Sequence, residues 1–105
     1  MTAIYEDYYC KDEVTLKITK YSSNGNLAIQ MISALSLWNE PFAMLTVNID
    51  EKLPSDMAYV DINNVRTAFD FITKYKLGEF KGIKQSGYCC YPLIKFNLDE
   101  VKKYE

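Results

Sequence analysis

The alternation of apolar and polar residues between positions 13 and 21 constrains the fold more than any other feature of the sequence. Apolar residues stand at every second position of this segment, at Val14, Leu16 and Ile18. The pair Asn24-Gly25 follows, and both residue types accept the positive φ of a tight hairpin turn. Residues 27–35 then return as an apolar strand. These segments predict a β-hairpin with one solvated face.

Two further segments have the composition of strands. Residues 42–49 are almost all apolar or Thr, which predicts a third strand in the centre of a sheet. Residues 57–62 predict a short fourth strand, after a loop that contains Pro54. The first three strands would form a meander, because short turns connect them.

A helix is predicted between residues 65 and 76. Its apolar residues recur with the helical period, at Val65, Ala68, Phe69 and Ile72. Asn63 or Asn64 would cap its start, and Gly78 would end it.

The remaining residues predict a loop, a strand and a last helical turn. Residues 79–86 are lysine-rich with a central Gly, which predicts a basic loop. Residues 87–96 predict a final strand, in which Pro92 favours an edge or a bulge because it lacks an N–H donor. Asn97 would cap the last turn, with Glu100 in the reciprocal position of a capping box.

This order of elements predicts an α+β fold. We expect an antiparallel meander sheet of four to five strands packed against one main helix, with a short C-terminal helix. The 105 residues would form a single domain, in which residues 1–12 are either an arm or an edge strand.

Composition argues against most kinds of catalysis. The chain has no His, so it lacks an imidazole base and the usual partner of a nucleophilic Ser or Cys. Its four Gly residues match no phosphate-binding loop. Cys89 and Cys90 are adjacent and point to opposite faces of a strand, which favours reduced thiols over a metal site. We therefore expect a non-catalytic protein without a cofactor.

The charges differ between the two parts of the chain. The first 70 residues carry a net negative charge, and the residues from Phe71 onward carry a net positive one. Acidic residues combined with tyrosines predict a partner-binding surface, because aromatic side chains are common interface anchors. The predicted residues are Tyr5, Glu6, Asp7, Tyr8, Tyr9, Glu40, Asp50, Glu51, Asp56 and Asp61.

A smaller basic group offers an alternative surface for nucleic acid. Its members are Lys74, Lys76, Lys81, Lys84 and Tyr88. Lysines on phosphates and rings on bases are typical of single-strand binding. The net charge of −2 argues against direct nucleic-acid binding by this chain.

Several segments resemble a family of small uncharacterised proteins carried by plasmids, conjugative elements and phages of Gram-positive bacteria. They are NGNLAIQ (24–30), LTVN (45–48), YVDINN (59–64), SGYC (86–89), YPL (91–93) and KFNL (95–98). The resemblance implies an anti-CRISPR-like inhibitor that binds a bacterial defence nuclease complex, such as a CRISPR effector. It would block nucleic-acid binding or activation. An alternative is an accessory protein of plasmid or conjugative-element maintenance that binds its own element's proteins or DNA.

The location and assembly of the chain are further expectations. No apolar run is long enough to cross a membrane, and no secretory signal is recognisable at the start, so we expect a cytoplasmic protein. An exposed edge strand would also allow the chain to form a homodimer.

Overall fold

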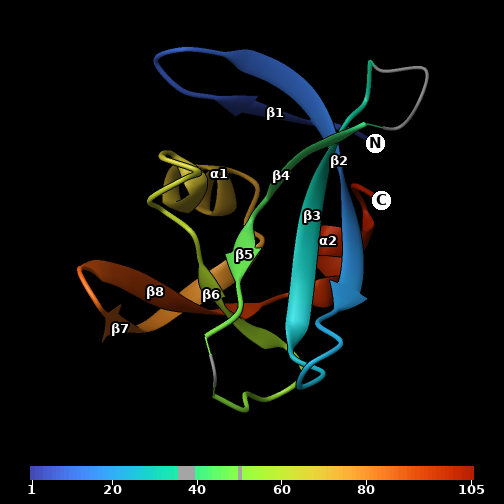
Figure 1. The fold of residues 1–105 in the computed structure, drawn as a ribbon. Coiled ribbons are helices and arrows are strands. Elements are labelled where there is room, and N and C mark those ends of the chain that lie inside the picture. The colour runs from blue at the N-terminus through green and yellow to red at the C-terminus, as the bar shows by residue number, and fades with distance from the viewer. Residues whose placement is uncertain (36–39, 50) are drawn as a thin grey trace.

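The computed structural model describes residues 1–35, 40–49 and 51–105. Within these ranges the chain forms two four-stranded antiparallel sheets and two short helices (Figure 1). The first sheet has the order β1-β2-β3-β4 and the second the order β5-β6-β8-β7. The strands are β1 (Ala3–Glu6), β2 (Lys11–Lys20), β3 (Leu27–Ser33), β4 (Pro41–Met44), β5 (Thr46–Val47), β6 (Met57–Val60), β7 (Gly78–Ser86) and β8 (Cys89–Phe96). The helices are α1 (Ala68–Lys74) and α2 (Leu98–Lys102).

The first sheet contains the predicted hairpin, formed by β2 and β3. Val14 and Leu16 are buried, as the alternation predicts. The turn differs in one detail, because Gly25 has a positive φ of 74° whereas Asn24 does not. The Asn24 side chain instead accepts a hydrogen bond from the N–H of Asn26 at 3.1 Å. The meander prediction is confirmed for β2, β3 and β4, and β1 adds an edge strand.

The predicted third strand, residues 42–49, is divided between the two sheets. Leu45 lies between β4 and β5 and is fully buried. Its N–H donates to the carbonyl oxygen of Ile29 in β3 at 2.9 Å, and its own carbonyl accepts from the N–H of Asp61 at 3.1 Å. The chain therefore leaves one sheet and enters the other at this residue. The prediction of one central strand is wrong.

The predicted basic loop at residues 79–86 is also wrong, because these residues form most of β7. The register of β7 against β8 shifts between Phe80 and Gly82, which makes Lys81 an extra residue in the strand. Pro92 lies on β8 directly before Leu93, at the end of the stretch that pairs with β6. Its missing N–H therefore removes no hydrogen bond to β6.

Helix α1 is shorter than predicted and begins later. Its N-cap residue is Thr67, not Asn63 or Asn64. The Thr67 hydroxyl makes no cap but donates to the carbonyl oxygen of Glu6 at 2.7 Å, which attaches the start of the helix to β1.

The end of α1 also differs from the prediction. Lys76 takes the left-handed conformation, with φ of 56°, and the N–H of Leu77 returns to the carbonyl oxygen of Ile72 at 2.9 Å. Gly78 is not the stop signal but the first residue of β7. An added Cβ at Gly78 would lie 2.7 Å from Cγ2 of Ile94, so the close contact between β7 and β8 requires a glycine there.

Helix α2 starts as predicted. Asn97 is its N-cap, and the Asn97 side chain accepts from the N–H of Glu100 at 3.4 Å. The reciprocal part of the capping box is replaced by an ion pair, since the Glu100 carboxylate binds Lys103 at 2.9 Å. In the part of the chain that the structure describes, no helix has the length and apolarity needed to cross a membrane.

The expected α+β fold with one sheet on one main helix is wrong, because the protein is mostly β. Both sheets contribute to one apolar core, with Leu16 and Met31 from the first sheet and Val60 and Ile94 from the second. Helix α1, which has only seven residues, cannot cover a whole sheet. It fills the space between β1 and β7, while α2 lies against β2 (Figure 1).

Candidate partner-binding surfaces

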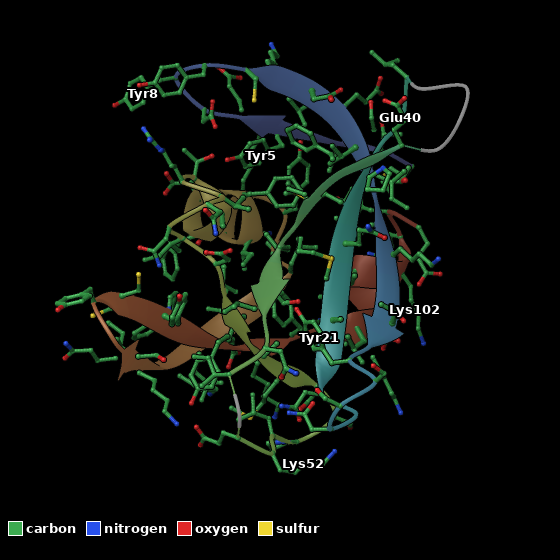
Figure 2. All side chains as sticks on the ribbon, in the orientation of Figure 1. Tyr5, Tyr8, Tyr21, Glu40, Lys52 and Lys102 are labelled. Carbon is green, nitrogen blue, oxygen red and sulfur yellow. The ribbon has the colours of Figure 1, made fainter. Side chains whose placement is uncertain are left out.

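The turn between β1 and β2 holds two exposed tyrosines on a fixed backbone. One carboxylate oxygen of Asp7 accepts hydrogen bonds from the N–H groups of Tyr9 at 2.8 Å and Cys10 at 2.9 Å. The N–H of Asp7 donates to the carbonyl oxygen of Cys10 at 2.9 Å, which closes the turn. Tyr8 is 96% exposed and Tyr9 is 80% exposed. Figure 2 shows Tyr8 at the tip of this hairpin, directed away from the molecule.

A cation lies over one of these rings. The guanidinium carbon of Arg66 is 5.3 Å from the centre of the Tyr9 ring, a distance typical of a cation–π contact. Arg66 directly precedes Thr67, whose hydroxyl binds Glu6. We call Tyr8, Tyr9 and Arg66 the tyrosine turn. Because two backbone N–H groups stabilise its charged form, the Asp7 carboxyl has a pKa lowered from the ordinary value.

Tyr5 does not belong to this surface, which corrects the prediction that it binds a partner. It is only 3% exposed, and its ring packs against Phe42 and Phe71 with centroid distances of 5.4 and 6.0 Å. Phe71 in turn contacts Tyr75, whose hydroxyl accepts from the N–H of Ile4 at 2.7 Å. Tyr5 therefore stabilises the packing of β1 on α1, and Figure 2 shows it between these two elements.

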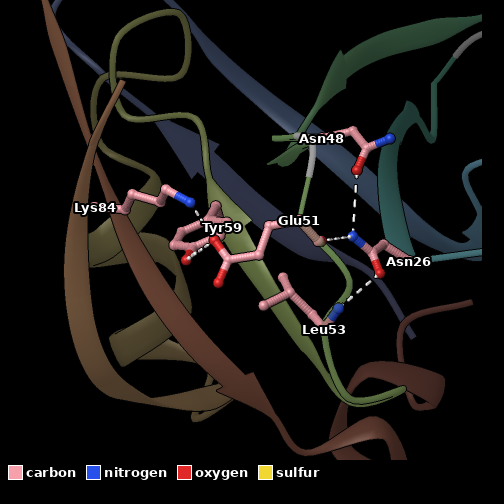
Figure 3. Close-up of polar contacts among 6 residues, drawn as sticks. All are labelled: Asn26, Asn48, Glu51, Leu53, Tyr59 and Lys84. Carbon is pink, nitrogen blue, oxygen red and sulfur yellow. Dashed lines mark hydrogen bonds and ion pairs between the residues drawn. The ribbon is translucent and has the colours of Figure 1, made fainter. Parts of the chain in front are cut away.

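The negative charge of Glu51 is paired with a lysine that was predicted to belong to the basic surface. Its carboxylate forms an ion pair with Lys84 and accepts from the Tyr59 hydroxyl at 3.1 Å (Figure 3). The Lys84 hydrogen bond is the main cause of the lowered pKa of Glu51, and the same bond raises the pKa of Lys84. Glu51 and Lys84 were predicted on surfaces of opposite sign, and the structure brings them together.

The backbone beside Glu51 is fixed by a buried asparagine. The Asn26 amide nitrogen donates to the Glu51 carbonyl at 2.6 Å, and its oxygen accepts from the N–H of Leu53 at 3.0 Å (Figure 3). Asn48 accepts a longer bond from the same amide nitrogen at 3.4 Å. These bonds attach the loop before β6 to the turn between β2 and β3. They are structural, because Asn26 is only 3% exposed.

The other predicted acidic residues that the structure describes are spread over several parts of the molecule. Asp61 accepts from the backbone and the side chain of Asn64 at 3.2 and 2.8 Å, which orders the segment before α1. Glu40 and Tyr8 lie at the same end of the molecule but on opposite sides of it (Figure 2). Glu6 lies 4.0 Å from Lys11 at the hairpin. Asp50 lies outside the described residues.

The predicted basic residues have different contacts. Lys81 pairs with Glu79 at 3.1 Å, as Lys84 does with Glu51. Lys74 lies over the ring of Tyr75 at 5.4 Å. Tyr88 is fully exposed at the tip of the β7–β8 hairpin. Two of the four predicted lysines therefore have a carboxylate partner.

A shallow hollow of about 690 Å³ lies where α1 ends and α2 begins. Its lining residues are Asp56, Thr73, Lys76, Gly78, Glu79, Lys95, Phe96, Asn97, Leu98 and Asp99. Carboxylates and lysines both line it, so its lining is of mixed charge. Within the described ranges, no three Cys, Asp or Glu side chains are placed to hold a metal ion.

The sequence did not identify an apolar area on the β7–β8 hairpin. Phe80 is 50% exposed, Ile83 is 66% exposed, and Phe69 of α1 contacts Phe80 with a centroid distance of 5.9 Å. The bulge at Lys81 interrupts the alternation of apolar and polar residues in this segment, so the sequence pattern did not indicate a strand. A strand prediction with one extra residue would have placed Phe80 and Ile83 on one face.

The comparison with protein families covers most of the chain. Residues 15–105 match the sequence model described as a domain of unknown function, DUF4313. The chain belongs to the DUF4313 family. No curated protein and no solved structure matches it. The expectation of an uncharacterised family is confirmed, whereas the genetic setting of that family stays a prediction.

The matched region includes some of the candidate surfaces of this DUF4313 protein and leaves out others. It contains the β7–β8 hairpin and the network around Glu51 and Asn26. It begins at Thr15, in the middle of β2, and so excludes β1 and the hairpin turn with Tyr8 and Tyr9.

Proposed function

We propose that this DUF4313 protein is a non-catalytic inhibitor that binds another protein through its tyrosine turn. The observation that carries the proposal is the pair of exposed tyrosines on a turn fixed by Asp7. Tyr and Arg are the residue types most often found at the energetic centre of protein interfaces, and the tyrosine turn contains both.

The rigidity of this turn supports a binding role. A side chain on a mobile loop loses conformational entropy when it binds, and a fixed backbone reduces that cost. The Asp7 carboxylate fixes the backbone of Tyr9 and Cys10 in the free protein. The Arg66 guanidinium lies over the Tyr9 ring and restricts it further. The turn therefore needs little reorganisation to bind.

The proposed partner is a bacterial defence nuclease complex, such as a CRISPR effector. This choice follows from the resemblance to proteins of Gram-positive mobile elements. The inhibitor would act by covering a surface that binds nucleic acid or by preventing activation. A cytoplasmic location is part of the proposal, because such effectors act there.

A combined binding and cleavage assay tests the proposal. The protein would be mixed in excess with purified CRISPR nucleases of Gram-positive bacteria, and both pull-down and target cleavage would be measured. We expect one effector to be bound and inhibited. Replacing both Tyr8 and Tyr9 by Ala should weaken that binding by about 2 kcal/mol or more.

The matched control is Leu35→Ala, since Leu35 is 73% exposed on a different turn. This variant should inhibit like the wild type. No binding to any effector, or equal inhibition by the tyrosine variant, would refute the proposal. A salt-sensitive DNA gel shift that needs Lys81 would favour the alternative, an accessory protein of plasmid maintenance.

A further inference from the structure

Strand β7 is an open edge of the second sheet. It runs for nine residues, and β8 pairs with only one of its sides. Among the described residues, no backbone group of β7 has a hydrogen-bond partner outside the β7–β8 ladder. The edge strand β1 of the first sheet differs, because the Tyr75 hydroxyl accepts from the N–H of Ile4 and the Thr67 hydroxyl donates to the carbonyl oxygen of Glu6. An open edge of this length can accept another strand.

The bulge in β7 places its two exposed apolar side chains on one face. Phe80 lies opposite Ile94 on β8, and Ile83 lies opposite Pro92. Ile94 and Pro92 are two residues apart, so they point to the same side of the sheet. In a regular strand without a bulge, positions 80 and 83 are three residues apart and would point to opposite sides. Phe80 and Ile83 therefore both lie on the face that also carries the core.

The charged side chains of β7 follow the same rule on the other face. Glu79 lies opposite Lys95, and Lys84 lies opposite Tyr91. Because positions 95 and 91 are four residues apart on β8, Glu79 and Lys84 point to one side of the sheet. The order Glu79-Phe80-Lys81-Gly82-Ile83-Lys84 is consequently complementary to its own reverse.

We propose that the protein forms a symmetric dimer in which β7 pairs antiparallel with β7 of a second copy. The two-fold axis lies between Lys81 and Gly82. In this register Phe80 lies opposite Ile83 of the second copy, and Glu79 lies opposite Lys84. Each of these contacts occurs twice, as two-fold symmetry requires. The dimer joins the two second sheets into one continuous sheet.

Neighbouring registers fit less well. A shift that places Lys81 opposite Lys81 brings two like charges together. The opposite shift places Phe80 opposite Lys84 and Glu79 opposite Gln85, which loses both the apolar and the charged pairs. Lysines and bulges usually discourage edge pairing. Here the bulge instead aligns the apolar pair, and Gly82, which has no side chain, lies opposite Lys81 of the second copy.

The mass of the protein in solution tests the dimer. Size-exclusion chromatography with light scattering, over a range of concentrations, should show a transition from one chain mass to two. Ile83→Lys places a lysine opposite Phe80 and should raise the dissociation constant by at least about tenfold. Leu35→Lys is the control, because Leu35 is similarly exposed but lies far from β7 in the chain, and it should dimerise like the wild type.

A charge exchange tests the register itself. Glu79→Lys alone and Lys84→Glu alone each place two like-charged pairs in the dimer and should weaken it. Each also breaks an ion pair within the chain, Glu79–Lys81 or Glu51–Lys84, so circular dichroism of each variant is compared with the wild type before mixing. Mixing these two variants restores both attractive pairs, so heterodimers should form where neither variant dimerises by itself. A loss of folding could not produce this rescue.

Two results would overturn the proposal. One is a wild type that remains a monomer at every concentration up to about 1 mM, where even weak dimers form. The other is a dimer that Ile83→Lys leaves unchanged or that mixing fails to rescue. These measurements need only the purified chain, so the dimer and the partner-binding proposal can fail independently.

Discussion

Two of the edge strands, β1 and β7, have different surroundings. Both belong to hairpins, and α1 contacts both. Side chains in and around α1 bind two backbone groups of β1: the Tyr75 hydroxyl accepts from the N–H of Ile4, and the Thr67 hydroxyl donates to the carbonyl oxygen of Glu6. Strand β7 contacts α1 through the side chains of Phe69 and Phe80, and among the described residues no hydrogen bond joins α1 to the backbone of β7.

The turn of the β1–β2 hairpin and the turn of the β7–β8 hairpin also differ in how firmly they are fixed. Asp7 fixes the first turn with two hydrogen bonds to backbone N–H groups. The second turn depends on Gly87, with φ of 63°, and on one long bond from Gln85 to its carbonyl at 3.4 Å. A covered edge with a fixed turn can present side chains, whereas an open edge can present its backbone. This contrast explains why we assign partner binding to one hairpin and self-association to the other.

The largest effect is expected for Tyr5, the residue by which β1 of the β1–β2 hairpin enters the core. Tyr5→Ala removes a ring that packs against Phe42 and Phe71, and it should reduce the free energy of unfolding by about 3–5 kcal/mol. Tyr8→Ala, three residues along, should change it by less than about 0.5 kcal/mol because Tyr8 is exposed. Urea unfolding measures both values. Similar effects of the two substitutions would show that β1 does not belong to the core.

Substitutions of two glycines on β7 test the pairing of β7 with β8. Gly78→Ala places a Cβ 2.7 Å from Ile94 Cγ2 and from the Lys95 carbonyl oxygen, and it should destabilise the protein by about 1–3 kcal/mol. Gly82→Ala is the control on the same strand, since its Cβ would meet nothing within 4 Å. It should leave stability within about 0.5 kcal/mol of the wild type. If Gly82→Ala were the more damaging change, the pairing of β7 with β8 would be wrong.

The same contrast explains how much of the fold the sequence predicts. The hairpin of β2 and β3 is predictable because one face is buried and the other solvated, so Val14 and Leu16 alternate with polar residues. Strand β7 has no such pattern, because its core-side residues Phe80 and Ile83 are exposed and Lys81 is an extra residue. An apolar segment such as 42–49 gives no sign that Leu45 divides it between sheets. That division depends on partners far away in the chain, Ile29 and Asp61.

The candidate surface was predicted only in part for a related reason. Composition identifies Tyr5, Tyr8 and Tyr9 as potential anchors but does not say which of them the fold buries. Strand alternation places Tyr5 inward, in register with Asp12 of β2, and the other two lie in the turn. Charge sums along the chain were less informative, because β7 crosses back and brings Lys84 to Glu51.

The smallest expected effect concerns the carboxyl pKa values of Asp7 and Glu51, which are both lowered but by different causes. Backbone N–H groups of Tyr9 and Cys10 lower the pKa of Asp7, whereas the Lys84 side chain is the main cause for Glu51. A lowered folded-state pKa stabilises the fold above the ordinary value, 3.8 for Asp7 and 4.5 for Glu51. This stabilisation is lost as the pH falls through the lowered value. Both groups should therefore contribute to unfolding in acid.

Salt should distinguish them. At 1 M NaCl the screening length is about 3 Å, which weakens the attraction between the exposed charges of Glu51 and Lys84. The hydrogen bonds to Asp7 come from neutral backbone groups inside its own turn and are less sensitive to salt. A carboxyl ¹³C NMR titration should show the pKa of Glu51 returning toward 4.5 in high salt while that of Asp7 stays lowered. Equal salt dependence would mean that the first turn is held by charge and not by its backbone, and the contrast between the hairpins would then rest on the edges alone.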